Sequence, residues 1–108
     1  MLTIDNIIII PQQNNANVHI NEMLHLRYLR EIAKEFGGYT ETEGMGGWIS
    51  PKGTLYHEKV YIITISTPLT SIFRVKAFLF DLGHTIKIEL DQESVFVNIA
   101  RMFTFFIT

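Results

Sequence analysis

Cysteine is absent from the 108-residue chain, and charge of neither sign predominates. Without cysteine, the chain has no disulfide framework, no thiolate metal site and no cysteine nucleophile. Nine Lys and Arg residues against eleven Asp and Glu residues leave a formal net charge of −2, so no overall basic field attracts nucleic acid. The lack of cysteine also fits a reducing compartment, and we expect a cytoplasmic protein that binds no nucleic acid.

Long hydrophobic runs are missing as well. Ile7–Ile10 and the apolar residues 102–108 are both shorter than the roughly 20 apolar residues that span a bilayer, so we expect no membrane segment. The first residues lack the basic stretch that begins a secretory signal. A chain of 108 residues that is 47% hydrophobic is typical of one globular domain, which we place at residues 1–108.

The first third of the chain predicts a strand followed by a helix. Leu2–Ile10 is rich in β-branched residues and becomes apolar on both faces, which is typical of a central strand. From Ile20 the apolar residues recur at helical spacing, and we expect Asn17 to cap this helix. The helix is predicted to end at Gly37–Gly38, because glycine adopts the left-handed conformation that follows a last turn.

The rest of the chain predicts a hairpin, a second helix and a last strand. Residues 39–67 alternate in polarity around a turn, with a bulge expected at Gly44–Gly47. Residues 69–91 carry an apolar stripe at helical spacing, which favours one continuous helix. The alternative is a strand at residues 85–90, where β-branched residues follow Gly83. Residues 95–100 alternate again and predict a strand.

This order of elements predicts an α+β fold of the ferredoxin-like βαββαβ type, with a four-stranded antiparallel sheet and two helices on one face. The uncovered face of such a sheet would remain partly apolar, and the aromatic tail at residues 102–108 adds to that surface. Large apolar patches mark interfaces, so we expect a homodimer that forms through the sheet. The alternative is that the tail folds back and closes the core.

Several short motifs resemble a known group of proteins. Residues 36–40, Gly47–Trp48 and Glu58–Val60, together with Asp91–Val95, resemble a set of small uncharacterised bacterial and phage proteins. Those proteins combine a glycine–tryptophan hairpin after the first helix with a Gln-Glu-(Ser/Ala)-Val start of the last strand, on a ferredoxin-like frame. The resemblance implies that frame and a long second helix, and it implies no activity.

Metal and nucleophile motifs are lacking. The four histidines have no spacing that holds a metal ion, and we expect them at surface or turn positions: His19, His25, His57 and His84. No serine lies in a G-x-S-x-G elbow, so no catalytic triad is predicted. We therefore expect no metal and no cofactor.

Acidic residues around the single tryptophan form the candidate binding site. Glu41 and Glu43 are two residues apart on a predicted strand, and Glu58 lies on the partner strand. We predict that these carboxylates surround Trp48 and direct it to a basic surface. Two alternatives remain: glutamates on an edge strand prevent edge-to-edge association, and Trp48 packs into the core.

Two functions from different classes follow. The first is a non-enzymatic protein-binding module, with no catalytic residue, that docks through the acidic hairpin and the apolar sheet face. High Ile and Asn content favours a phage or mobile element, so an inhibitor of a host (defence) protein fits. The alternative is a small enzyme that uses Glu41, Glu43 or Glu58 as acid–base groups.

Overall fold

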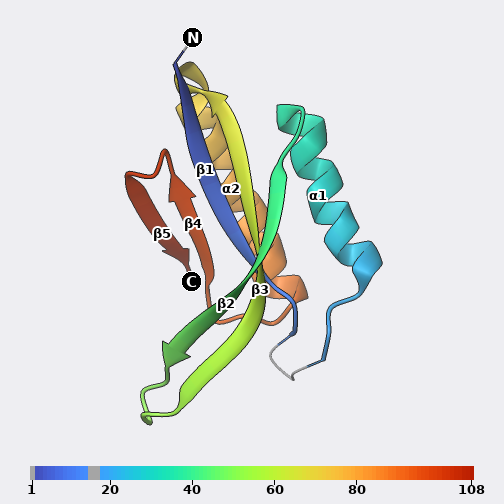
Figure 1. Cartoon of the computed structure of the whole chain (residues 1–108), viewed down its shortest axis with the longest axis vertical. Helices are drawn as coiled ribbons and strands as arrows, with labels where there is room; N and C mark the ends of the chain where they lie inside the picture. The colour runs from blue at the N-terminus through green and yellow to red at the C-terminus, as the bar shows by residue number, and fades with distance from the viewer. Residues whose placement is uncertain (1, 15–17) are drawn as a thin grey trace.

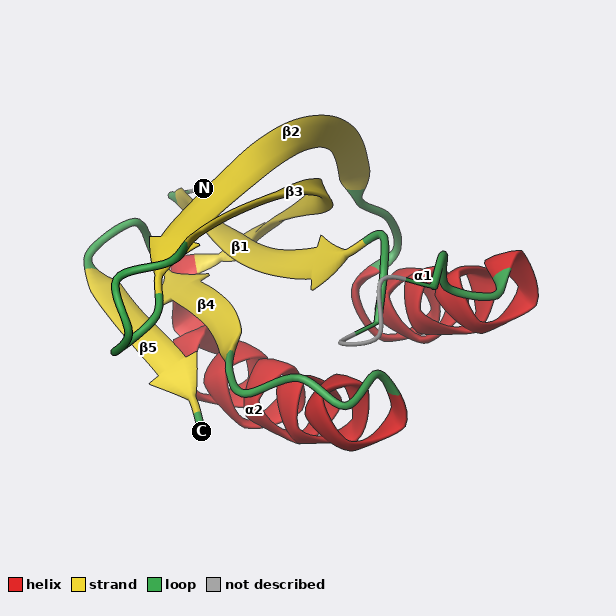
Figure 2. Cartoon of the chain, turned by 90° about the horizontal axis from the view of Figure 1, so that it is seen from below, coloured by secondary structure: helices red, strands yellow, loops and turns green. Residues whose placement is uncertain are grey.

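The computed structural model describes residues 2–14 and 18–108, which form one antiparallel sheet with helices on one of its faces (Figures 1 and 2). In chain order, the elements are β1 (Thr3–Pro11), α1 (Glu22–Phe36), β2 (Thr40–Ile49), β3 (Leu55–Pro68), a 3₁₀ turn (Leu69–Ser71), α2 (Ile72–Glu89), β4 (Val95–Ile99) and β5 (Phe103–Ile107). The order of the five strands in the sheet is β2-β3-β1-β4-β5.

The α+β class is confirmed, but the prediction of a four-stranded ferredoxin-like sheet is wrong. Residues 103–107 form a fifth strand that pairs antiparallel with β4, so that Val97 lies opposite Phe105. The aromatic tail therefore adds a fifth strand to the sheet, whereas the strand predicted at residues 95–100 was expected to be the last. β5 forms because the chain reverses tightly after Ile99.

That reversal is a tight turn with two left-handed residues. The Met102 amide donates to the Ile99 carbonyl over 3.1 Å, and Ala100 and Arg101 have φ values of 58° and 56°. Two successive positive φ values are the requirement of a type I′ hairpin turn, which normally uses Asn-Gly. A distant side chain stabilises the turn, because the Ala100 amide donates to Asn6 Oδ1 over 3.0 Å.

Replacing Ala100 by asparagine and Arg101 by glycine together is expected to stabilise the fold by about 1–2 kcal/mol, because both residues tolerate the left-handed conformation. The change removes only a long, exposed contact between Arg101 and Asp5, at 3.7 Å, and such pairs contribute little. Chemical denaturation measures the difference. A variant that is less stable than the parent would contradict the assignment of strain to this turn.

Local signals explain the ends of α1. The helix begins after Asn21, whose Oδ1 accepts from the Met23 amide over 2.8 Å. It ends at Gly37, which has a φ of 88° and donates to the Ala33 carbonyl. Asn21 is thus the cap, whereas the predicted cap, Asn17, lies outside the described residues.

The second helix is continuous through residues 72–89, which confirms the helical prediction and excludes a strand at residues 85–90. Gly83 lets β5 approach closely, since a Cβ there would meet the Ile107 side chain. No helix within residues 2–14 and 18–108 is long and apolar enough to cross a membrane.

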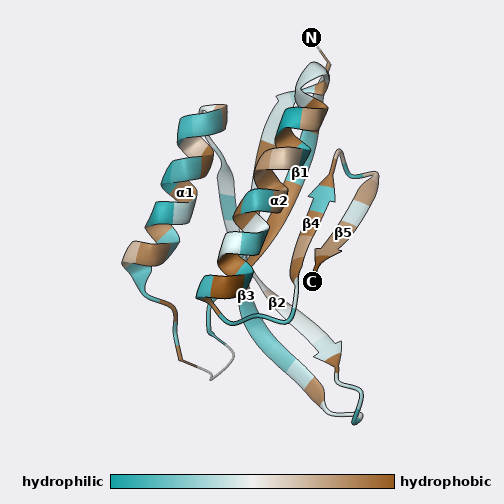
Figure 3. Cartoon of the chain, turned by 180° about the vertical axis from the view of Figure 1, so that it is seen from behind, coloured by the Kyte–Doolittle hydropathy of each residue, from teal (hydrophilic) through white to brown (hydrophobic). Residues whose placement is uncertain are grey.

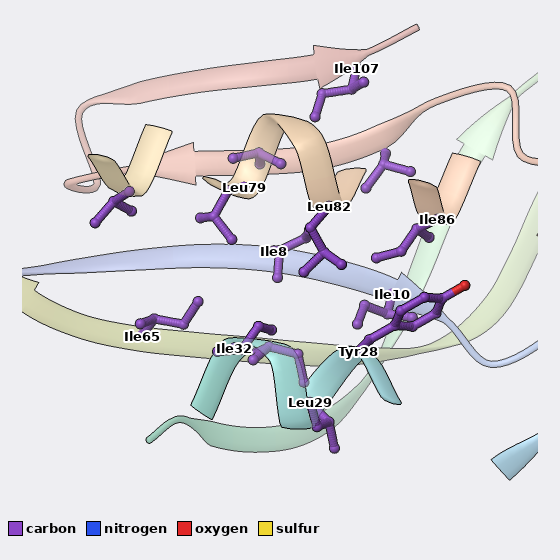
Figure 4. Close-up of a cluster of buried hydrophobic side chains, with 14 of the residues drawn as sticks. Ile8, Ile10, Tyr28, Leu29, Ile32, Ile65, Leu79, Leu82, Ile86 and Ile107 are labelled. Carbon is purple, nitrogen blue, oxygen red and sulfur yellow. The ribbon is translucent and has the colours of Figure 1, made fainter. Parts of the chain in front are cut away.

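The core lies between the sheet and the two helices (Figure 4). Coloured by the hydropathy of each residue, β1 and β4 are mainly hydrophobic, whereas hydrophilic and hydrophobic residues alternate along α1 (Figure 3). The largest fully buried side chains come from the two helices and from β1, β3 and β4: Ile8, Ile10, Tyr28, Ile32, Ile63, Ile65, Val75, Leu79, Ile86, Val95, Val97 and Ile99.

The tail both closes the core and leaves apolar surface. Phe105 packs edge-on against Phe80 of α2, with ring centroids 5.0 Å apart, and Ile107 is buried. Phe103 and Phe106 remain exposed. The expected homodimer therefore stays a prediction, and light scattering of the purified chain tests it.

Candidate active site

The β2–β3 hairpin has two faces with different surroundings. Its pairing runs without interruption from Thr40 opposite Thr64 to Ile49 opposite Leu55, so the expected bulge at Gly44–Gly47 is not there. Because side chains alternate along a strand, Glu41 and Glu43 point to one face, and Trp48, with an even number, points to the other. The structure therefore does not bring the four predicted binding residues together.

Glu41 and Glu43 lie on the face that α1 covers. Glu41 Oε1 is hydrogen-bonded to His25 Nε2 of α1, and the His25 ring stacks on Tyr61 with centroids 4.0 Å apart. Glu43 Oε1 accepts from Gln12 Nε2 over 3.2 Å. Burial raises the pKa of Tyr61, and the charges of Glu43 and Glu41 raise this pKa further.

This cluster has a structural function. His25 is only 6% exposed, so the prediction of a surface or turn position is wrong for this residue. Its bond to Glu41 and its stack on Tyr61 attach α1 to the hairpin. The cavity lined in part by Glu43 is small, about 270 Å³, and ligand sites usually occupy about 300–1,000 Å³.

Trp48 and Glu58 line a larger cavity on the opposite, open face of the sheet. Its volume is about 510 Å³, which is within the range of small-molecule sites. All five strands and the loop between α2 and β4 contribute to it. The lining residues are Ile9, Pro11, Asn14, Gly46, Gly47, Trp48, Tyr56, Glu58, Val60, Gln92, Glu93, Ser94, Phe96 and Phe106.

Two aromatic pairs belong to the lining of this cavity. Trp48 and Tyr56 lie opposite each other in the hairpin and stack with centroids 4.7 Å apart and an interplanar angle of 17°. Phe96 of β4 meets Phe106 of β5 edge-on, with centroids 5.5 Å apart. Flat, partly exposed aromatic rings stack well on planar heterocycles such as nucleobases.

Carboxylates supply the charge of the cavity. Glu58 is half-buried, and burial raises the pKa of its carboxyl. Glu93 lies in the loop after α2, where Asp91 has a φ of 50° and the Gln92 amide donates to the Lys87 carbonyl over 2.9 Å. Asp is among the residues that tolerate this left-handed conformation. The turn places Gln92, Glu93 and Ser94 at the cavity.

Replacing Glu58 by glutamine is expected to raise the melting temperature of the unliganded chain at neutral pH and to change it little at about pH 4. Because burial raises the pKa of Glu58 in the folded chain, ionising this carboxyl costs more free energy in the folded chain than in the unfolded chain. The protonated carboxyl of Glu58 therefore makes its full contribution to the free energy of unfolding below the ordinary pKa of glutamic acid. This contribution is lost as the pH rises through the raised pKa. Thermal unfolding at both pH values measures this, and a lower melting temperature of the variant at neutral pH would contradict it.

Several of these lining residues were not predicted as a site. From the sequence, Gln92-Glu93-Ser94 predicts only the start of the last strand, and Phe106 only part of an apolar tail. Both segments can be recognised in the sequence, but no sequence pattern places either of them beside Trp48. Among the described residues, no group of three or more His, Asp or Glu side chains could hold a metal ion.

A comparison with solved structures finds a protein of the same fold. A solved structure of a phage SAM lyase in complex with S-methyl-5′-thioadenosine superposes with a TM-score of 0.76. The match covers 98% of this chain and 89% of the other chain, at 17% sequence identity. The two proteins share a fold. No family model matches the sequence, and no curated protein matches it significantly.

The match to the phage SAM lyase corrects the functional interpretation. A non-enzymatic protein-binding module that inhibits a host protein was the first expectation, but the solved structure that shares this fold is an enzyme. The finding overturns that expectation, together with the preference for a non-enzyme over the alternative of a small enzyme. The resemblance to uncharacterised bacterial and phage proteins stays a prediction.

Proposed function

We propose that this chain is a small lyase that cleaves S-adenosylmethionine (SAM) at a carbon–sulfur bond and releases S-methyl-5′-thioadenosine. The cavity on the open face of the sheet is the proposed active site. The observation that carries the proposal is the shared fold with the phage SAM lyase, which extends over nearly the whole chain. The phage origin that composition favours stays a prediction, as does the cytoplasmic location.

The chemistry of the lining supports this assignment. The exposed ring pair of Trp48 and Tyr56 offers a stacking surface for adenine. Glu58 offers a carboxylate for the sulfonium centre or for the ribose hydroxyls. Of the three carboxylates proposed for acid–base chemistry, Glu58 alone lines this cavity, so Glu41 and Glu43 are not part of the proposed site.

The proposed reaction needs no second substrate. The sulfonium is a good leaving group, because the electron pair of the broken C–S bond neutralises its positive charge and leaves a thioether. The four-carbon fragment balances the reaction in one of two ways. Its own carboxylate attacks the γ-carbon and closes a ring, or the neighbouring carbon gives up a proton to the Glu58 carboxylate and a double bond forms. The cavity positions the substrate for either route.

Incubation of the purified chain with SAM, followed by mass spectrometry, tests the proposal. We expect S-methyl-5′-thioadenosine to appear in step with the loss of SAM, and the mass of the four-carbon fragment distinguishes ring closure from proton loss. Absence of S-methyl-5′-thioadenosine would contradict the proposal.

Two glycines, one in the cavity lining and one outside it, provide a test variant and its control. A Cβ at Gly46 would lie 3.4 Å from Val60 Cγ1, and both residues line the cavity. Gly46→Val therefore fills the cavity with a residue that strands favour, and we expect it to fold and to lose activity. Gly38→Ala is the control, because a Cβ there meets nothing within 4 Å.

A further inference from the structure

The cavity on the open face carries charge of one sign. Glu58 from β3 and Glu93 from the loop before β4 are both lining residues, and the other residues of the lining are apolar, aromatic, glycine or uncharged polar. Among the described residues, neither carboxylate takes part in an ion pair with a basic side chain. The lining thus contributes a formal charge of −2 when both groups are ionised.

A carboxylate at the wall of a cavity gains from a cationic ligand. Burial removes part of the water that stabilises the Glu58 carboxylate, which explains the direction of its pKa shift. A cation beside it restores the lost stabilisation, and the attraction is stronger than in water because the effective dielectric constant is lower. A neutral ligand of the same shape removes water from the carboxylates without this compensation.

We propose that Glu58 and Glu93 make this cavity selective for cationic sulfonium nucleosides over neutral thioether nucleosides of the same shape. The inference rests on the proposed function and deepens it. Cleavage transfers the electron pair of the C–S bond to sulfur, so the substrate is a sulfonium cation and the nucleoside product is neutral. The same two carboxylates therefore retain the substrate and release the product.

Two analogues that the chain cannot cleave by this route test the selectivity. Sinefungin carries a protonated amine in place of the sulfonium centre, and S-adenosylhomocysteine carries a neutral thioether there. The nucleoside and amino-acid ends of the two analogues are the same. By isothermal titration calorimetry, we expect the unaltered chain to bind sinefungin at least about ten-fold more tightly than S-adenosylhomocysteine.

Replacing the carboxylates identifies their contribution. In the E58Q/E93Q double variant we expect the affinity ratio to fall below about three-fold, with each single variant in between. E43Q is the matched control, because Glu43 lies on the opposite face, and its ratio should equal that of the unaltered chain. Circular dichroism verifies that each variant is folded.

The outcomes separate the two proposals. A ratio near one in the unaltered chain, or an unchanged ratio in the double variant, overturns the selectivity. Equal weakening of both analogues by E58Q also overturns it, since that result means that Glu58 binds the ribose. If the chain releases S-methyl-5′-thioadenosine from SAM and yet binds both analogues alike, only this inference fails. If it neither cleaves SAM nor binds either analogue, the proposed function fails too.

Discussion

Replacing Trp48 by alanine is expected to weaken nucleoside binding by about 10- to 100-fold, the loss that follows removal of one aromatic stacking surface. The ring lines the cavity, is 39% exposed and stacks on Tyr56. Its removal should lower the free energy of unfolding by less than about 1.5 kcal/mol, because the side chain is outside the buried core. Calorimetric titration with S-methyl-5′-thioadenosine and chemical denaturation measure the two quantities.

Two further variants make the Trp48 experiment specific. Trp48→Phe keeps a stacking ring and should recover part of the affinity. Tyr39→Ala removes an aromatic side chain of similar exposure, 40%, that does not line the cavity, so its affinity should match that of the unaltered chain. A loss of about 3–5 kcal/mol in folding stability with Trp48→Ala would instead identify the ring as core.

Replacing Asn6 by alanine is expected to lower the free energy of unfolding by about 2–4 kcal/mol. The side chain is fully buried, and its Nδ2 donates to the Ile65 carbonyl and to Thr67 Oγ1, each over 3.1 Å. Its Oδ1 accepts from the Ala100 amide over 3.0 Å. Alanine leaves these buried partners unsatisfied, and a domain of this size has only about 5–15 kcal/mol of stability in total.

Hydrogen exchange adds a local readout for Asn6. Because Asn6 binds the turn between β4 and β5, we expect amide protection in β5 to fall more than protection in β3. Asn98→Ala is the control, since the Asn98 side chain donates one hydrogen bond, to Thr104 Oγ1, and should cost about 1 kcal/mol. A loss below about 1 kcal/mol for Asn6→Ala would contradict the importance of this network.

Much of the fold could be predicted because local patterns determine it. The apolar spacing of α1, the left-handed Gly37 and the stripe along α2 act within a few residues of each other. β5 could not be predicted in this way. Its turn at Ala100–Arg101 has no Asn or Gly signal, and it is stabilised by Asn6, 94 residues away in the sequence.

The site was only partly predictable, and one assumption explains the error. A bulge at Gly44–Gly47 would have inserted one residue and turned Trp48 to the face of Glu41 and Glu43. The regular pairing instead places Glu58 opposite Gly46 and Trp48 opposite Tyr56, on the uncovered face. Which of two regular faces a helix covers depends on tertiary packing, and the alternation of residues alone cannot decide it.

The cavity takes lining from both the first and the last strand in chain order, and this arrangement determines when a newly made chain has a complete cavity. Ile9 belongs to the first strand synthesised and Phe106 to the last, so a nascent chain still held at the ribosome before β5 emerges has an incomplete cavity. A chain that stops after β4 also lacks the contacts of Phe105 and Ile107 with α2. The activity proposed above is therefore expected only after all five strands have been made, and a prematurely terminated product that lacks β5 should not cleave S-adenosylmethionine.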